Sequence, residues 1–264
     1  MGKRILLSFD VEEFDLPKEY GVGISESEQF GFSLEGLKKV VGLLNEEGVR
    51  ATFFVTASFA LKYPSVIKEI SKKHEVGSHG FSHGSWVYSE GEVRKSKEVI
   101  EGVIGKGVSG FRMSRLQKVD YSSLRKLGFV YDSSIAPSFI PGRYNYFFEK
   151  RKIELKEGVY VVPISVLPVL RLPFSWIFFR NFGLGYGKMI TLASIKTLGF
   201  VNFYLHPWEF NSLDKFRVPW YVKKNSGDVL MRYLLDYVRW CKKKGFVFST
   251  FSEYLAFYAG DKNA

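Results

Sequence analysis

The sequence predicts an α/β fold, a single-domain barrel in which short parallel strands alternate with helices. Short apolar runs alternate with segments whose apolar residues recur every three or four positions, as expected of strands joined by crossover helices. About seven or eight such runs occur, and 264 residues is a common length for one barrel domain, so we expect a single domain over residues 1–264. No glycine-rich phosphate loop follows the first run, which favours a barrel over an open nucleotide-binding sheet.

The N-terminal part contains two predicted strands with a helix between them. Residues 5–9 and 51–55 are apolar runs of strand length. Between them, apolar residues at helical spacing predict an amphipathic helix over 34–44, with Ser33 as its cap and Gly48 just past its end.

Residues before and after this first unit give further signals. We expect residues 21–31 to form a surface loop. Pro64 opens a predicted helix that runs to residue 73, and a short strand follows at 74–78. Ser89-x-x-Glu92 has the pattern of a capping box and predicts the start of another helix.

The second half continues the same alternation. Helical stretches there end at Gly128, Gly199 and Gly245. Further strands are predicted at 108–111, 129–131, 160–166, 201–205 and 246–249. Prolines and an arginine interrupt the most apolar stretch, 159–179, so we expect a strand followed by an aromatic loop there and no transmembrane segment.

Composition limits the classes of function. The 38 basic and 27 acidic residues give a net charge of +11, but the basic residues are spread over helix-like segments and only 242–244 forms a run. No arginine-rich block with interleaved aromatic residues is present, so we expect no nucleic-acid partner. Cys241 is the single cysteine, which excludes an internal disulfide and a cysteine-based metal cluster. The first apolar run is too short for a signal peptide, so we expect a cytoplasmic protein.

Polar residues follow several predicted strands. Five of them come at or just after the end of an apolar run: Asp10, the segment around His79, Arg112, Asp132 and His206. Because the carboxyl ends of parallel barrel strands form one face, we expect these side chains to converge there.

Two histidines in this set have the spacing of metal ligands. His79 and His83 lie four residues apart, which on a helical turn or a tight loop brings both imidazoles to one side. A carboxylate would complete a set of two histidines and one carboxylate with open positions for water and substrate. The acidic cluster that follows the first strand, Asp10-Val11-Glu12-Glu13, is the candidate donor.

Five segments in order give a resemblance to a known family: Leu7-Ser8-Phe9-Asp10, Ser78-His79-Gly80-Phe81-Ser82-His83, Gly110-Phe111-Arg112, Tyr131-Asp132-Ser133-Ser134 and Tyr204-Leu205-His206-Pro207-Trp208-Glu209. From about residue 5 to residue 255, the chain resembles the polysaccharide deacetylases, carbohydrate esterase family four. The resemblance is to the intracellular-type branch with Phe-Asp-Val-Glu and His-Pro-Trp-Glu motifs.

This resemblance implies a distorted barrel of seven or eight strands and one divalent metal ion, usually zinc. It also implies the roles of the matching residues, namely Asp10 as catalytic base, Arg112 as the residue that orients it, His206 as general acid, Asp132 as the carboxylate that tunes this acid, and His79 and His83 as metal ligands. Such an ion lowers the pKa of its water toward about 7, which supplies the nucleophile that an amide requires.

The sequence departs from the family pattern at two places. Position 11 is valine where the family commonly has a second, metal-binding aspartate, so Glu12 is the expected substitute ligand, with Glu13 and Asp15 as weaker alternatives. After Arg112 the usual proline is replaced by Met113-Ser114, which changes the loop that supplies an oxyanion donor. Ser114 and Trp208 are the candidate substrate-contacting residues.

The sequence therefore predicts a hydrolase that removes N-acetyl groups from an acetamido sugar or glycan precursor. Two alternatives stay open: an allantoinase-like hydrolase of cyclic amides or imides, and a catalytically silent glycan-binding barrel. The expected partner is a carbohydrate, and the basic charge suggests one linked to a nucleotide or, at the inner membrane surface, to a lipid. Aromatic residues over 174–182 could stack on sugar rings, contact a lipid tail or bury a homo-oligomer interface.

Overall fold

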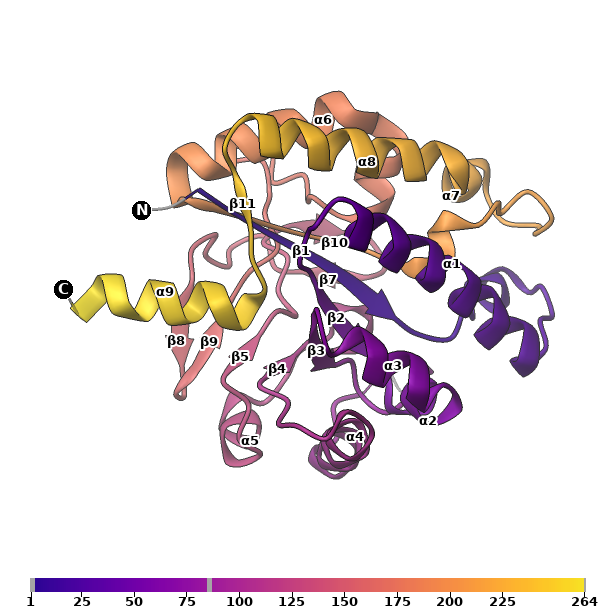
Figure 1. The fold of residues 1–264 in the computed structure, drawn as a ribbon, viewed down its shortest axis with the longest axis horizontal. Coiled ribbons are helices and arrows are strands. Elements are labelled where there is room, and N and C mark those ends of the chain that lie inside the picture. Colours follow the sequence, from indigo (N-terminus) through magenta and orange to yellow (C-terminus); the bar gives the residue numbers. More distant parts are fainter. Residues whose placement is uncertain (1–2, 85–86, 264) are drawn as a thin grey trace.

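A computed structural model describes residues 3–84 and 87–263, and its centre is one curled, mostly parallel sheet (Figure 1). Neighbouring strands follow the order β10 (Phe200–Leu205), β1 (Arg4–Val11), β2 (Thr52–Val55), β3 (Glu75–Ser78), β4 (Gly110–Phe111), β5 (Tyr131–Asp132), β9 (Val159–Val161) and β8 (Glu154–Lys156). Only β8 pairs antiparallel along this path. The predicted α/β barrel is confirmed as a curled half-barrel of a single domain.

Helices lie around the outside of this sheet (Figure 1). They are α1 (Glu26–Glu46), α2 (Ala57–Lys62), α3 (Pro64–Ile70), α4 (Glu90–Ile104), α5 (Tyr121–Lys126), α6 (Trp176–Leu198), α7 (Trp220–Lys223), α8 (Asp228–Lys243) and α9 (Phe251–Asn263). The 3₁₀ helices η1 (Leu16–Tyr20), η2 (Ser114–Leu116) and η3 (Pro207–Phe210) follow β1, β4 and β10. A small hairpin pairs β6 (Phe139–Ile140) with β7 (Tyr144–Asn145).

Strand β1 organises the sheet. It pairs with β10 on one side, and on the other with β11 (Val247–Phe248) at its start and with β2 at its end. Every residue of β10 is buried, as are all of β1 except Arg4. Such continuous apolar runs are typical of parallel strands covered on both faces, and they explain why these strands were recognisable from the sequence.

A side chain helps to close the barrel between β10 and the segment after β9. The backbone N–H of Ser165 donates to the carbonyl of Asn202 at 2.8 Å. The Asn202 amide donates to Ser133 Oγ at 3.0 Å and to the carbonyls of Val162 and Pro163 at 3.2 and 3.1 Å. These bonds connect β10 to the segments that follow β5 and β9.

Helix α1 corrects two predictions. It begins at Glu26, and the cap is Ser25, whose hydroxyl accepts from the Glu28 backbone N–H at 3.2 Å. Ser33 is therefore a buried residue inside the helix, and the predicted loop over 21–31 is wrong from residue 26 onward. Phe30 packs in the core and extends the apolar stripe toward the N-terminus. At α4, Ser89 is the N-cap as expected, but its side chain makes no capping hydrogen bond.

The aromatic segment 174–182 also differs from the expected loop, because helix α6 begins at Trp176. The helix is kinked at Gly183, which has a left-handed φ of 72°. Phe174 stacks on Phe203 with ring centroids 4.3 Å apart, whereas the side chain of Phe182 is 63% exposed. The cluster is thus divided between the core and the surface.

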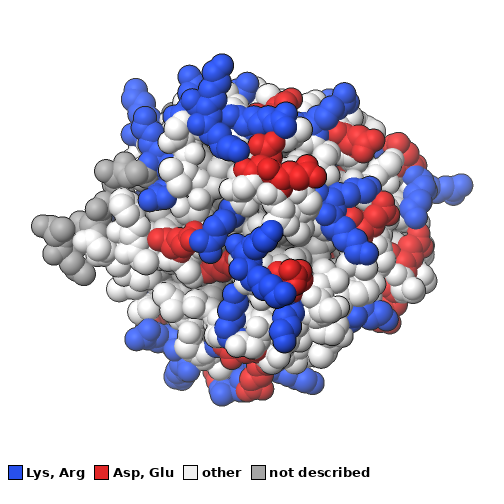
Figure 2. All heavy atoms as spheres, viewed as in Figure 1, with Lys and Arg blue, Asp and Glu red and all other residues white. Residues whose placement is uncertain are grey.

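The described residues contain no helix long and apolar enough to cross a membrane. The surface shown in Figure 2 carries lysine and arginine side chains over many elements, with aspartate and glutamate among them. This distribution agrees with a basic protein whose charge is spread over its helices.

Candidate active site

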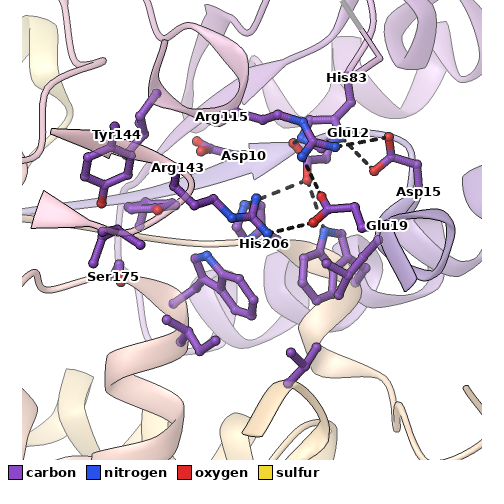
Figure 3. A pocket seen from close by; sticks show the side chains of 18 of the residues that line it. Asp10, Glu12, Asp15, Glu19, His83, Arg115, Arg143, Tyr144, Ser175 and His206 are labelled. Atoms are coloured by element: carbon purple, nitrogen blue, oxygen red, sulfur yellow. Dashed lines mark hydrogen bonds and ion pairs between the residues drawn. The ribbon is translucent and has the colours of Figure 1, made fainter. Parts of the chain in front are cut away.

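The carboxyl ends of the strands meet at a cavity of about 270 Å³ (Figure 3). Asp10 lies near the end of β1, His79 follows β3 and His206 follows β10, and all three line this cavity. Arg112, which follows β4, lies behind Asp10 and is completely buried. The predicted convergence of these residues at one end of the barrel is present in the structure.

Asp10 is held by Arg112. The guanidinium Nη1 donates to Asp10 Oδ1 at 2.7 Å and to Ser8 Oγ at 2.9 Å. Its Nε and Nη2 donate to the carbonyl and hydroxyl of Ser133 at 3.0 and 2.9 Å, and the group lies 4.2 Å from the ring centre of Phe54. These contacts fix one carboxylate oxygen of Asp10.

Glu12 directly follows β1, two residues after Asp10, and both residues line the same cavity. Its Oε2 is 3.2 Å from His79 Nε2 and 3.3 Å from His83 Nε2. Its Oε1 accepts from the indole N–H of Trp208 at 3.3 Å. Oε2 itself is buried without a hydrogen-bond partner, although buried carboxylate oxygens are normally satisfied.

The two histidine rings are oriented by their other nitrogens. Nδ1 of His79 lies 2.8 Å from the backbone carbonyl of Arg112, and Nδ1 of His83 lies 2.8 Å from Asp15 Oδ1. Carbonyl and carboxylate oxygens only accept, so both Nδ1 atoms carry the hydrogen. In the neutral rings, both Nε2 atoms therefore direct a lone pair toward Glu12, as metal-ligating histidines do.

Two distances in this cluster are close to those between neighbouring ligands of one metal ion. Tetrahedral sites with bonds of about 2.0 to 2.1 Å place neighbouring ligand atoms about 3.3 to 3.4 Å apart, close to the two distances from Glu12 Oε2. Over residues 3–84 and 87–263, no group of three or more histidine, cysteine, aspartate or glutamate side chains is placed so that it could hold a metal ion as it stands. A cation bound here would give the unpartnered Glu12 oxygen a partner and would use the lone pairs of the two oriented imidazoles.

His206 faces the same cavity. Its Nε2 lies 3.8 Å from Glu12 Oε1, and its Nδ1 lies 3.1 Å from Glu209 Oε1. Trp208 stacks on the imidazole with centroids 4.9 Å apart, and Trp176 and Tyr204 meet it edge-on at 5.4 and 5.5 Å. The ring is thus confined on several sides, with Nε2 toward the cavity.

Burial and neighbouring charges shift the pKa values of Glu12 and His206 in this cluster. Burial raises the pKa of Glu12, but His83, His206 and His79 outweigh it and hold this pKa well below its usual range. Burial lowers the pKa of His206, but Glu12, Glu209 and Asp10 raise it above its usual value. Acidic and imidazole groups in this pocket therefore stabilise each other's charged forms.

Two predicted site residues lie elsewhere. Asp132 is buried and accepts from the backbone and hydroxyl of Ser134 at 3.1 and 2.5 Å, and burial raises its pKa to about 6. Among the described residues, His206 donates no hydrogen bond to Asp132. Ser114 is also buried, and its hydroxyl donates to the carbonyl of His79 at 2.8 Å, outside the cavity lining. Trp208 does line the cavity.

Four further residues at the site were not singled out from the sequence, namely Glu209, Arg115, Glu19 and Arg143. Glu209 was visible within the His-Pro-Trp-Glu motif, but its hydrogen bond to His206 was not foreseen. Arg115, in the altered third motif, has a left-handed φ of 57° and donates to Glu19 at 2.6 Å. Arg143 from the β6–β7 hairpin also donates to Glu19, at 2.7 Å, so this glutamate joins two loops at the cavity rim (Figure 3). No sequence signal indicated this long-range ion pair.

Comparison with known proteins identifies proteins to which this chain is similar. The family model described as polysaccharide deacetylase matches residues 3–131. A peptidoglycan-N-acetylglucosamine deacetylase of Bacillus cereus is 32% identical over 81 residues, which are 28% of this chain and 30% of that protein. The chain thus matches less than a third of the length of this relative.

Solved structures share the fold over nearly the whole chain. A protein of Mycobacterium smegmatis assigned to the polysaccharide deacetylases has a TM-score of 0.66 at 20% identity, covering 99% of this chain and 92% of that chain. The Puue allantoinase has a TM-score of 0.62 at 14% identity, covering 95% and 88%. At these identities the likeness concerns the fold. The family model thus covers just under half of the chain, residues 3–131, and the solved structures extend the shared fold over nearly its whole length.

Proposed function

We propose that this chain is a metal-dependent hydrolase that removes N-acetyl groups from an acetamido sugar or glycan precursor. The observation that carries the proposal is the approach of His79 Nε2 and His83 Nε2 to one unpartnered oxygen of Glu12. The family match supports the same reaction class.

Glu12, His79 and His83 would hold one divalent cation, for which zinc is our proposal because two imidazoles and a carboxylate are ligands that zinc accepts in an open site. When bound, the cation supplies Lewis-acid activation of water and of the amide carbonyl. Asp15 and the Arg112 carbonyl, which bind the Nδ1 hydrogens, keep both rings in the ligating tautomer.

The remaining residues manage protons. Asp10 accepts the proton of the attacking water, with Arg112 fixing one of its oxygens so that the other is available. His206 donates from Nε2 to the departing amine nitrogen, which is too basic to leave without a proton. Cleavage of the C–N bond then yields acetate and the free amino sugar.

The test is an acetate-release assay on the zinc-loaded protein with three substrate classes: N-acetylglucosamine oligomers, nucleotide-linked acetamido sugars and lipid-linked acetamido sugars. Release from one class, abolished by a chelator and restored by zinc, is the expected result. Silence with all three classes would remove the proposal. Hydrolysis of a cyclic amide by metal-free protein would favour the ring-opening alternative, and sugar binding without turnover the silent barrel.

The carrier of the sugar and the cellular location are further parts of the proposal. The net charge of +11 favours substrates with a phosphate link, for which the Michaelis constant should rise steeply with salt. We propose a cytoplasmic enzyme, at the inner membrane surface if the substrate is lipid-linked. The exposed part of the aromatic segment, which includes Phe182, would then contact lipid or a second copy of the chain. Vesicle flotation and the mass in solution separate these two uses.

A further inference from the structure

Glu209 makes two hydrogen bonds to one residue. Its Oε1 accepts from the His206 backbone N–H at 2.8 Å and lies 3.1 Å from His206 Nδ1. His206 is the N-cap of the 3₁₀ helix η3, and Glu209 lies within this helix, three residues later. Glu209 is completely buried. Because a carboxylate only accepts, this contact places a hydrogen on Nδ1 and turns Nε2 toward the cavity.

The other oxygen of Glu209 meets a buried cation. Glu209 Oε2 lies 3.3 Å from Arg180 Nη1, and both side chains are 0% exposed. Arg180 comes from α6, also donates to the carbonyl of Val222, and lies 5.1 Å from the ring centre of Trp176. The two atoms form an ion pair without a hydrogen bond, and this contact between buried opposite charges restrains the Glu209 side chain.

The neighbouring aromatic rings cannot replace this contact. Trp208, Trp176 and Tyr204 restrict the plane of the His206 ring. None of these ring contacts decides which of its nitrogens carries the hydrogen, whereas an acceptor at Nδ1 does. Glu209 therefore decides which nitrogen of the His206 ring carries the hydrogen and which nitrogen faces the cavity.

We propose that Glu209 is the positioning residue of His206 and that Arg180, held between α6 and η3, keeps Glu209 in place. This inference rests on the proposed function. In the amide cleavage, the imidazolium of His206 gives its Nε2 proton to the amine nitrogen and becomes neutral with Nδ1–H still bonded to Glu209. Glu209 takes no part in this proton transfer, and solvent returns the proton to Nε2.

The experiment compares Glu209→Gln with the zinc-loaded wild type, using the substrate class that is turned over. We expect kcat to fall about 10²-fold to 10⁴-fold while KM and zinc content stay within about twofold. Glu209→Asp should regain part of kcat. Glu75→Gln is the matched control, since Glu75 also accepts a backbone N–H, from Phe251 at 2.9 Å, but at the other end of the barrel. It should leave kcat unchanged.

Removing one member of a buried ion pair can prevent folding. The second variant is therefore Arg180→Met with Glu209→Gln, which removes both charges; it should fold and still show the loss in kcat. Nitrogen-15 NMR of His206, recorded at a pH where the ring is neutral, gives a readout independent of turnover, with hydrogen on Nδ1 in the wild type and a mixture of tautomers in the double variant. A kcat within twofold of wild type, or an unchanged tautomer, would overturn the inference. Absence of turnover in the wild type would instead count against the proposed function alone.

Discussion

His83 and His74 are both buried, yet their pKa values shift in opposite directions. At the cavity, burial lowers the pKa of His83, but Glu12 and Asp15 outweigh burial and raise it to about 9. His74, just before β3, has its pKa lowered to about 4 by burial and by the charges of Arg50 and Lys73. The sign is thus decided by the neighbouring charges, and carboxylates gather at the carboxyl end of the barrel, where His83 lies.

The strongest test of this contrast is His83→Ala. Loss of one of two imidazoles should abolish zinc retention and lower kcat/KM by more than about a thousand-fold, because the activating cation is lost. Metal analysis after dialysis and the acetate assay measure the two effects. His74→Ala serves as the control and should keep full zinc content. Zinc retained by His83→Ala would show that the acidic cluster does not make this histidine a ligand.

Asp10→Asn separates the proton acceptor from the ligands in the same cluster. The amide keeps the size of the side chain and can still accept from Arg112, but it cannot take a proton from water. We expect kcat to fall about 10²-fold to 10⁴-fold with zinc content unchanged. If zinc were lost together with activity, Asp10 would be a ligand, and the division of roles between Asp10 and Glu12 would be wrong.

Trp208→Phe tests whether the hydrogen bond from Trp208 to the proposed ligand Glu12 contributes to metal affinity. It removes the N–H that donates to Glu12 Oε1 at 3.3 Å and keeps an aromatic ring beside His206. Outer contacts of this kind typically change metal affinity about 10-fold to 100-fold, which is the loss we expect from competition with a chelating dye. Trp176→Phe, which alters a ring contact to His206, should change zinc affinity by less than about twofold. Equal effects would mean that the hydrogen bond does not matter.

The smallest expected effect concerns stability at the other end of the barrel. Burial and the charges of Arg50 and Lys73 lower the pKa of His74 from its usual 6.5 to about 4 in the folded state, so the unfolded chain binds more protons between these pH values. Folding stability should therefore fall as pH decreases from 6.5 toward 4. Because His74 lines a groove open to solvent, we expect a loss of about 1 to 2 kcal/mol between pH 7 and pH 5. In His74→Leu, the free energy of unfolding measured with urea should fall less between pH 7 and pH 5, by this amount. An equal decrease in wild type and variant would contradict the assignment.

Sequence reasoning succeeded where chain order determines position. Parallel strands share one edge, so Asp10, His79 and His206 could be placed together from the ends of apolar runs. It failed where a side chain chooses between nearby partners. Ser25 and Ser33 are both plausible caps, and only the packing of Phe30 extends the helix to the earlier one.

The same limit applies to the predicted partner of His206. Asp132 ends β5, a strand of two residues, where the periodic pattern is too short to fix the side-chain direction. The partner of His206 is instead three residues away in a 3₁₀ helix, a local backbone geometry that the motif alone did not reveal.

One hydroxyl connects the closure of the barrel to the proposed base. Ser133 Oγ accepts from Asn202 at 3.0 Å and from Arg112 at 2.9 Å, and it donates to the Val162 carbonyl at 2.9 Å, which uses its full capacity. A local opening between β10 and β9 would disturb the guanidinium that orients Asp10. The position of the Asp10 carboxylate therefore depends on the contacts that hold β10 against the segment after β9.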